Sequence, residues 1–386
     1  MSRFADVVIV GAGVIGCSAA FHLAQAARAG DARLGGRRVV VTEKGATGSG
    51  MTKRSSALIH THFSDATQAR LALASLRYFQ NWKEVVGGNC GFTQTGLAVV
   101  GGAADAANLR DQVTQLQATG ANTRIVTREE LRELQPAVHV DDLTLAAYQS
   151  EAGFADPMAT TQTLAARAKA MGVDFRTGTL VKSIRVERAS VVGIDTTTGA
   201  LEASTVVVAA GPWSDHLLRP LGVEIGIRAA RMQVAFFDRP SELKRGHAAF
   251  LDATTGAYFR PHTFGLTLGG LSTPPTDSVN PDHFDETIAR EFVAEVQQHI
   301  AARLPAMAQA RFVRGHAGVY DISPDARPVV SRVPGITGLI IATGFGGTGF
   351  AIAPAVGACI AELVTDGEAR TVDVRAWQFA RFSEDI

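Results

Sequence analysis

The sequence is poor in cysteine, which limits the kinds of site it can build. Its 386 residues include three cysteines, Cys17, Cys90 and Cys359, and these form no CxxC pair and no cluster with histidine. A disulfide framework and a zinc site both need such groupings. We therefore expect three buried free thiols and no metal centre.

An excess of charge and a long apolar run are also missing. Lysine plus arginine and aspartate plus glutamate both number 37, so the formal net charge is zero. Nucleic acids and anionic membranes attract basic surfaces, so neither is expected as the main partner. The apolar run 351–364 is interrupted by Pro354 and is shorter than the roughly 20 residues that span a bilayer. With no signal-peptide pattern at the start, we expect a cytoplasmic protein without a transmembrane segment.

The chain is too long for one ordinary hydrophobic core, and its elements suggest a discontinuous arrangement. Continuous apolar runs at 6–10, 39–42 and 205–210 are typical of buried parallel strands. Shorter strand patterns between 226 and 270 indicate an antiparallel sheet. A last apolar strand at 338–343 precedes a helix expected from about residue 353 to 366. We expect an α/β domain formed by residues 1–86, 143–220 and 316–386, and a second domain formed by 87–142 and 221–315.

A GxGxxG motif joins the first strand to the first helix. Gly11 makes the turn, Gly13 lets the backbone approach a pyrophosphate, and Gly16 lets the helix and strand pack closely. The free N–H groups of the helix start, with Val14 and Ile15, suit phosphate. Glu43 ends the second strand, where a carboxylate can bind both hydroxyls of an adenosine ribose. These features indicate a dinucleotide and leave NAD and FAD both open.

Further segments, in order along the chain, resemble one family. They are GATGSGMTKRSSAL at 45–58, EAGFADP at 151–157, VVVAAGPW at 206–213, YDISPD at 320–325 and GFGGTGF at 344–350. Together with GxGxxG, this ordered set resembles the FAD-dependent D-amino-acid oxidase and glycine–sarcosine oxidase (DAO) superfamily. Each motif alone is modest, but the set spans nearly the whole chain.

The resemblance implies an α/β fold and a bound FAD. The expected architecture is a Rossmann-like FAD-binding domain (GR2 type) with a discontinuous second α+β substrate domain built on an antiparallel sheet. The glycines of 344–350 would bring backbone N–H groups to the flavin. The expected cofactor-contacting residues are Gly11, Gly13, Val14, Ile15, Gly16, Glu43, Lys44, Gly50, Met51, Thr52, Ser55, Ser56, Ala57, Val181, Ala210, Gly211, Trp213, Gly344, Gly346, Gly347, Thr348 and Gly349.

Two positions depart from the family pattern. Some relatives attach flavin through a cysteine where this chain has Gly318, so FAD is expected to be non-covalent. Sarcosine oxidase relatives use a lysine for oxygen activation within a segment resembling 264–269, and Thr267 matches it here. The electron acceptor, oxygen or an electron-transfer partner, therefore stays open.

Four residues are candidates for contact with the substrate. His60 matches a family arginine that holds the substrate carboxylate, and a protonated histidine could replace it; alternatively, His60 and His62 only line a loop. Tyr258 and Arg260 share one face of a strand by its period of two, where the guanidinium would suit a carboxylate or would point to solvent. His316 could face the substrate or pack near the flavin.

The reaction that the resemblance implies is oxidation of the C–N bond of a small amine by hydride transfer to flavin N5. The product imine would hydrolyse in water, and the protein would mainly position the substrate and exclude water. A 2-hydroxy acid or polyol phosphate dehydrogenase on the same fold, an NAD enzyme, and a flavin-carrying electron-relay subunit are the alternatives. A homo- or hetero-oligomer is compatible with each of them.

Overall fold

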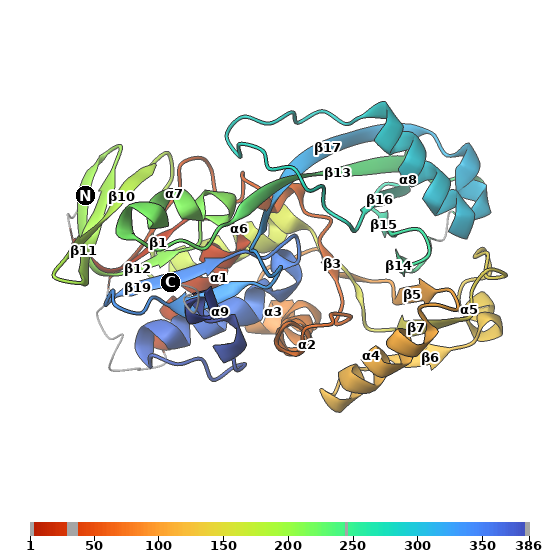
Figure 1. Cartoon of the computed structure of the whole chain (residues 1–386), viewed down its shortest axis with the longest axis horizontal. Coiled ribbons are helices and arrows are strands. Elements are labelled where there is room, and N and C mark those ends of the chain that lie inside the picture. The colour runs from red at the N-terminus through yellow and green to blue at the C-terminus, as the bar shows by residue number, and fades with distance from the viewer. Residues whose placement is uncertain (1–3, 29–37, 244–245, 383–386) are drawn as a thin grey trace.

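The computed structural model describes residues 4–28, 38–243 and 246–382. Two large sheets account for most strands, and they lie at opposite ends of the longest axis (Figure 1). Long strands and an extended coil run between the two ends. In the described part of the chain, no helix has both the length and the apolarity that crossing a membrane would require.

The first sheet is built around parallel strands. β1 (Phe4–Val10) lies between β12 (Gly199–Val208) and β2 (Val39–Thr42), and β19 (Leu339–Thr343) pairs in parallel with β12. The continuous apolar runs of these strands are buried, as expected for a sheet covered on both faces. The remaining strands of this sheet are β9 (Asp174–Arg176), β10 (Val181–Glu187), β11 (Ser190–Thr196) and β18 (Val329–Arg332).

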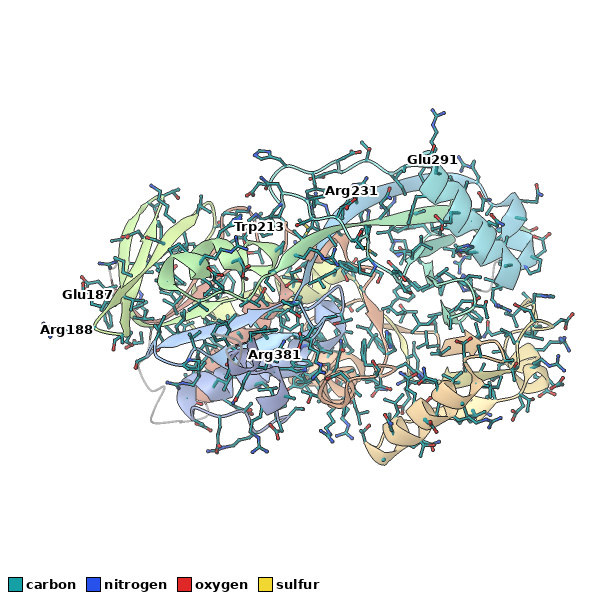
Figure 2. All side chains as sticks on the ribbon, viewed as in Figure 1. Glu187, Arg188, Trp213, Arg231, Glu291 and Arg381 are labelled. Atoms are coloured by element: carbon teal, nitrogen blue, oxygen red, sulfur yellow. The ribbon has the colours of Figure 1, made fainter. Side chains whose placement is uncertain are left out.

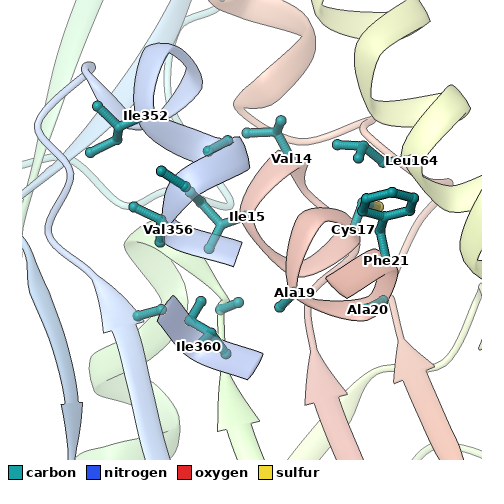
Figure 3. Packing of buried hydrophobic residues seen from close by; sticks show 14 of the residues in the cluster. Val14, Ile15, Cys17, Ala19, Ala20, Phe21, Leu164, Ile352, Val356 and Ile360 are labelled. Atoms are coloured by element: carbon teal, nitrogen blue, oxygen red, sulfur yellow. The ribbon is translucent and has the colours of Figure 1, made fainter. Parts of the chain in front are cut away.

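Helices with small apolar residues cover one face of this sheet. α1 (Val14–Arg28) is buried from Val14 to Ala24, because α6 (Pro157–Ala170) and α9 (Gly349–Thr365) pack on either side of it. Figure 3 shows Ile15 beside Val356 of α9, and Phe21 beside Leu164 of α6. The other helices near this sheet are α2 (Ala66–Gln80), α3 (Trp82–Val85) and α7 (Ser214–Leu218).

The second sheet is antiparallel except for one pair. Its order is β17 (Phe312–Ile322), β13 (Arg228–Asp238), β16 (Leu266–Leu271), β15 (Ala257–His262), β14 (Ala249–Asp252), β5 (Leu97–Gly101), β7 (Leu145–Gln149) and β6 (Arg124–Val126). Among the described residues, β14 and β5 form the only parallel pair of this sheet. α8 (Arg290–Arg303) packs on one face, and α4 (Ala106–Ala118) and α5 (Arg128–Leu134) lie beside the short strands at the far end.

A small third sheet links the two halves. It consists of β3 (Leu58–Ile59), β8 (Gly153–Phe154) and β4 (Thr93–Gln94). The expected fold class is confirmed: a Rossmann-like α/β unit carries a second unit built on an antiparallel sheet. β7 and all of β17 belong to the second sheet. If the domains are divided by sheet membership, one domain boundary falls after Gln149, where the sequence suggested residue 142. Another falls after Ile322, where the sequence suggested residue 315.

Candidate active site

A cavity of about 1020 Å³ lies where the carboxyl ends of β1, β2 and β12 meet the second sheet. This volume is at the upper end of the range for small-molecule sites, about 300–1,000 Å³. In open α/β sheets, ligands bind at the carboxyl ends of the strands, where the chain turns to a helix. The position of the cavity therefore agrees with a nucleotide-type ligand.

The GxGxxG turn forms one end of the cavity. The N–H of Gly11 donates to the carbonyl of Thr42 at 2.8 Å, and Gly11 has φ +105°. A Cβ at Gly11 would lie 2.4 Å from the carbonyl oxygen of Ala209, so only glycine fits. A Cβ at Gly16 would lie 1.9 Å from the carbonyl oxygen of Gly11. Gly16 therefore serves helix–strand packing, and it does not line the cavity.

Glu43 is held by the same turn. One carboxylate oxygen accepts from the N–H of Ala12 at 2.9 Å, and the other accepts from the N–H of Gly45 at 2.8 Å. These two bonds fix the carboxylate at the cavity wall. Each carboxylate oxygen can accept more than one hydrogen bond, so the pair of ribose hydroxyls expected at this position can still be bound.

A coil from the second sheet closes the cavity beside Glu43. Asp282 lies between β16 and α8, and its Oδ1 is 2.6 Å from Nζ of Lys44 and 2.9 Å from Nε1 of Trp213. The Lys44 ammonium also lies 3.7 Å above the Trp213 ring. Figure 2 shows Trp213 near α7, and the coil between β16 and α8 runs toward this region from the second sheet in Figure 1. Two segments distant in sequence are thus joined over one end of the cavity.

The C-terminal glycine-rich loop forms another wall. Gly347 has φ +89°, and a Cβ there would lie 2.2 Å from the Tyr320 ring. Oδ2 of Asp321 accepts from the N–H of Gly344 at 2.8 Å and from the hydroxyl of Thr343 at 3.3 Å. Burial raises the pKa of Asp321, although several hydrogen bonds oppose the rise. Asp321 thus holds the loop in its conformation against the second sheet.

The helix after this loop begins earlier than the sequence indicated. α9 starts at Gly349 and not near residue 353. Pro354 lies inside the helix, and the N–H of Ala355 bonds to Oγ of Ser75 at 3.1 Å. Because Gly349 lines the cavity, the free N–H groups of the helix start lie at its wall, where they favour negative charge.

Most expected cofactor residues line this single cavity. Those that do are Gly11, Gly13, Val14, Ile15, Glu43, Lys44, Gly50, Met51, Thr52, Ser55, Ser56, Val181, Ala210, Gly211, Trp213, Gly347 and Gly349. Gly16, Ala57, Gly344, Gly346 and Thr348 are not among the lining residues. A carboxylate fixed beside GxGxxG and glycine-rich turns beside aromatic side chains fit the adenosine and flavin ends of one FAD.

Comparison with known families agrees with this geometry. Residues 6–363 match the family model described as DAO, FAD dependent oxidoreductase. The chain belongs to this family. It is therefore a FAD-dependent oxidoreductase, and the enzyme class expected from the sequence is confirmed.

The DAO chain is similar to proteins from several organisms. It is 27% identical to the mouse FAD-dependent oxidoreductase domain-containing protein 1, over 98% of this chain and 85% of that protein. The crystal structure of L-proline dehydrogenase from P. horikoshii superposes with a TM-score of 0.90 at 27% identity, covering 99% of both chains. Glycine oxidase from Geobacillus kaustophilus gives a TM-score of 0.84 at 25% identity, covering 98% of this chain and 99% of that one.

Tyr258 and Tyr320 close the cavity from the second sheet. Both line it, and the Tyr258 side chain lies close to those of Tyr320 and Ser56. Burial raises the pKa of both phenols, that of Tyr258 well above its ordinary value. Both side chains therefore stay neutral and can act as hydrogen-bond donors at neutral pH. Gly270 makes room for the Tyr258 ring, since a Cβ at that position would lie 2.6 Å from its oxygen.

Arg260 lies on the same face as Tyr258 but behind the cavity wall. Its Nε donates to the carbonyl of Ser56 at 2.6 Å, and Nη1 donates to the carbonyl of Pro261 at 2.9 Å. The guanidinium lies 4.2 Å from the Phe154 ring centre. Burial lowers its pKa to about 9, so it stays charged at neutral pH. Contact with a substrate carboxylate stays a prediction.

The histidine candidates lie outside the cavity wall. His60 is stacked on Phe63 with ring centres 4.5 Å apart, and burial lowers its pKa to about 3. A histidine that stays neutral cannot bind a carboxylate by charge, so the geometry does not support that role for His60. His62 bonds to the Thr123 hydroxyl at 2.8 Å. Nε2 of His316 lies 3.2 Å from the carbonyl of Arg54, beside the flavin end of the cavity.

The position matched to the oxygen-activating lysine does not face the cavity. Thr267 is fully buried, and its hydroxyl lies 2.8 Å from Nε2 of His247. Its strand neighbours Leu266 and Leu268 belong to the apolar cluster that contains Tyr258. Alternation along β16 therefore turns Thr267 to the other face. The absence of a lysine at residue 267 thus carries no information about oxygen.

Several cavity residues were not among those expected from the sequence. Tyr320 and Asp321 fall inside the YDISPD motif, so that motif could have identified them. Arg54 pairs with Glu286 at 2.5 Å, and both line the cavity. Asp282 and Glu286 belong to a coil with no recognisable motif, and only the three-dimensional structure brings them to the site.

Buried neutral histidines predict a loss of stability in mild acid. Burial lowers the pKa of His60 to about 3, and those of His22, His62 and His247 to about 4. In the unfolded chain, histidine titrates near 6.5. Below that pH the unfolded state binds more protons than the folded state. The stability is therefore fully present above pH 6.5 and decreases as the pH is lowered further. Each of these histidines lowers the free energy of unfolding by about 1 kcal/mol between pH 6.5 and pH 5.5.

Urea unfolding at pH 7.5, 6.5 and 5.5 measures this effect. His62→Gln keeps a partner for Thr123 and removes one titrating group. We expect the variant to lose less stability than the wild type over the same interval, by about 1 kcal/mol. A free energy of unfolding that does not change between pH 7.5 and 5.5 would contradict the assignment.

Proposed function

We propose that this enzyme oxidises the C–N bond of a small amino acid or N-alkyl amino acid. The observation that carries the proposal is the apolar face of the second sheet, with its paired tyrosines, against the flavin end of the cavity. FAD, when bound, supplies the hydride acceptor. The product of amine oxidation is an imine, which hydrolyses in water. Both similar structures named above are enzymes whose names specify an amino acid.

The chain's own residues position the substrate and exclude water. The hydroxyls of Tyr258 and Tyr320 can donate hydrogen bonds to the substrate carboxylate, since burial keeps both phenols protonated. Val234 and Met232 line the cavity beside them and keep its wall apolar. Arg260 fixes Ser56 through its carbonyl and adds a positive charge behind the wall. Such preorganised groups are the main protein contribution in cofactor enzymes.

We further propose that FAD is held without a covalent bond to cysteine. All three cysteines are buried, and none lines the cavity. At Gly318, a Cβ would lie 3.2 Å from the side chain of Arg54, so the arginine stem occupies the neighbouring space. Trichloroacetic acid precipitation is expected to leave all the yellow colour in the supernatant. Colour retained in the pellet would contradict this proposal.

Anaerobic reduction of the flavin tests the substrate class. Stopped-flow mixing with N-methyl amino acids, D- and L-amino acids and 2-hydroxy acids is expected to bleach the 450 nm band only with amines. Reduction by 2-hydroxy acids but not by amines would overturn the amine chemistry. Absence of reduction by any member of the panel would instead support an electron-relay subunit.

A further inference from the structure

A long connection between the second sheet and its helix borders the cavity. Residues 272–289 join β16 to α8, and they form no helix or strand, although the structure describes all of them. Structureless connections longer than about 12–15 residues are uncommon in compact domains and usually have a function, for example as active-site lids. Four residues of this connection line the cavity, namely Pro281, Asp282, Phe284 and Glu286. We call residues 280–285 the tip of the connection.

The tip is anchored on the second sheet at both of its ends. Before the tip, the N–H of Val279 donates to the carbonyl of Ala229 in β13 at 2.8 Å. After the tip, the N–H of Ala317 in β17 donates to the carbonyl of Glu286 at 3.1 Å. The tip therefore has two fixed ends about which it can move, as a lid moves about its hinges.

The middle of the tip is fastened to the first sheet by one carboxylate. Oδ1 of Asp282 is 2.6 Å from Nζ of Lys44 and 2.9 Å from Nε1 of Trp213. Lys44 comes after β2 and Trp213 comes after β12, and these strands flank β1. With neighbouring strands about 4.8 Å apart, β2 and β12 are about 10 Å apart. We call these three side chains the clasp.

The clasp spans the place expected for the pyrophosphate of a dinucleotide. The GxGxxG turn follows β1, and a pyrophosphate lies at such a turn, against the start of the helix. The clasp joins the segments on both sides of this turn, and all three of its side chains line the cavity. FAD with its ribose at Glu43 and its pyrophosphate at the turn would lie beneath the clasp. Its entry and release would then require the clasp to open.

The clasp can open without unfolding the rest of the chain. The side chains of Lys44 and Asp282 are 38% and 44% exposed, and exposed ion pairs contribute little to stability. Among the residues of the tip, only Pro281 is buried. Segments with few buried apolar contacts open locally at a low cost in free energy. The tip therefore has the weak attachment that a reversible lid needs.

We propose that the tip is a lid that controls the exchange of FAD, and that Asp282 holds it closed. The clasp consists of protein groups alone, so its strength should be the same in the apoprotein and in the holoenzyme. It then slows association and dissociation of FAD by the same factor and leaves the dissociation constant unchanged. This inference rests on FAD occupying the cavity, and it is independent of the substrate.

The exchange kinetics of Asp282→Ala test the proposal. Quenching of FAD fluorescence on mixing with apoprotein gives the association rate constant, and replacement of bound FAD by radiolabelled FAD in the holoenzyme gives the dissociation rate constant. Both should rise by about tenfold, because the substitution removes the acceptor of two donors. Their ratio should stay within about twofold of the wild-type value. Asp282→Asn keeps an acceptor oxygen for Trp213 and loses the ion pair, so both rate constants should rise by about threefold.

Asp277→Ala is the matched control. Asp277 is an exposed aspartate of the same connection that lies outside the tip and does not line the cavity. The same loss of charge should therefore leave both rate constants unchanged. If Asp282→Ala releases FAD faster but binds it no faster, Asp282 stabilises bound FAD directly and the lid is overturned. Rate constants equal to those of the wild type would also overturn it. Failure of every amine to reduce the flavin would leave this result unaffected.

Discussion

Gly347→Ala is expected to yield a folded protein that purifies without flavin. At φ +89° an L-residue is strained, and its Cβ would lie 2.2 Å from the Tyr320 ring. The left-handed conformation costs about 1–2 kcal/mol, and forcing a buried group apart costs about 1–3 kcal/mol. The backbone strain and the steric clash both distort the part of the cavity wall expected to contact the flavin. FAD affinity should therefore fall by about 100-fold or more. Absorbance at 450 nm per chain, and FAD titration of apoprotein, measure the loss.

Gly346→Ala separates the two costs. Gly346 precedes Gly347 in the same loop and has φ +56°, but a Cβ there would meet nothing within 4 Å. This variant bears only the backbone strain, so it should retain flavin with an affinity within about tenfold of the wild type. If Gly347→Ala keeps its flavin as well as Gly346→Ala does, the loop does not contact the cofactor in the way described.

Glu43→Ala is expected to weaken FAD binding at the other end of the cavity, again by about 100-fold. The substitution removes the acceptor for two ribose hydroxyls, and hydrogen bonds to charged groups are worth about 1.5–3 kcal/mol each. It also leaves the N–H groups of Ala12 and Gly45 without their carboxylate partner. Fluorescence titration of apoprotein with FAD gives the dissociation constant directly.

FMN supplies the control for this prediction, because it contains the flavin and lacks the adenosine. Glu43→Ala should leave FMN affinity unchanged while FAD affinity falls. Glu43→Gln retains one acceptor oxygen and should give an intermediate loss, about tenfold. A parallel loss of FMN and FAD affinity would mean that Glu43 acts through the fold and not through the ribose.

Features that depend on neighbouring residues could be predicted from the sequence. The turn at Gly11, the helix start at Val14 and the carboxylate at Glu43 follow from one strand–helix–strand unit. Their side-chain requirements are set within that unit, as the close approach of Gly16 to Gly11 shows. The glycine-rich loop before α9 was also recognisable, because its backbone conformation needs glycine at Gly347.

Features that depend on long-range pairing could not be predicted in the same way. Nothing local in residues 272–289 indicates that Asp282 reaches Lys44 and Trp213. Which side chains of β16 point to which face of the sheet is another such feature, since a register shift of one residue moves every side chain to the other face. Thr267 was matched to a functional lysine, whereas its neighbours Leu266 and Leu268 are the residues that pack in the apolar cluster with Tyr258. Sheet register, which sequence patterns do not fix, decided that outcome.

The burial of one candidate site residue could not be predicted from the sequence either. His60 was a reasonable anion ligand while its surroundings were unknown, because histidine titrates near neutrality. In the structure His60 is buried and stacked on Phe63, and burial lowers its pKa to about 3.

In our interpretation, the GxGxxG and GFGGTGF segments hold opposite ends of one FAD. The most direct measurement is the flavin content of the purified chain, identified by chromatography after acid release and quantified against protein. We expect one FAD per chain, with no FMN or NAD, and its loss in both Glu43→Ala and Gly347→Ala. A wild-type protein that contains no FAD, or FAD occupancy insensitive to either substitution, would contradict it.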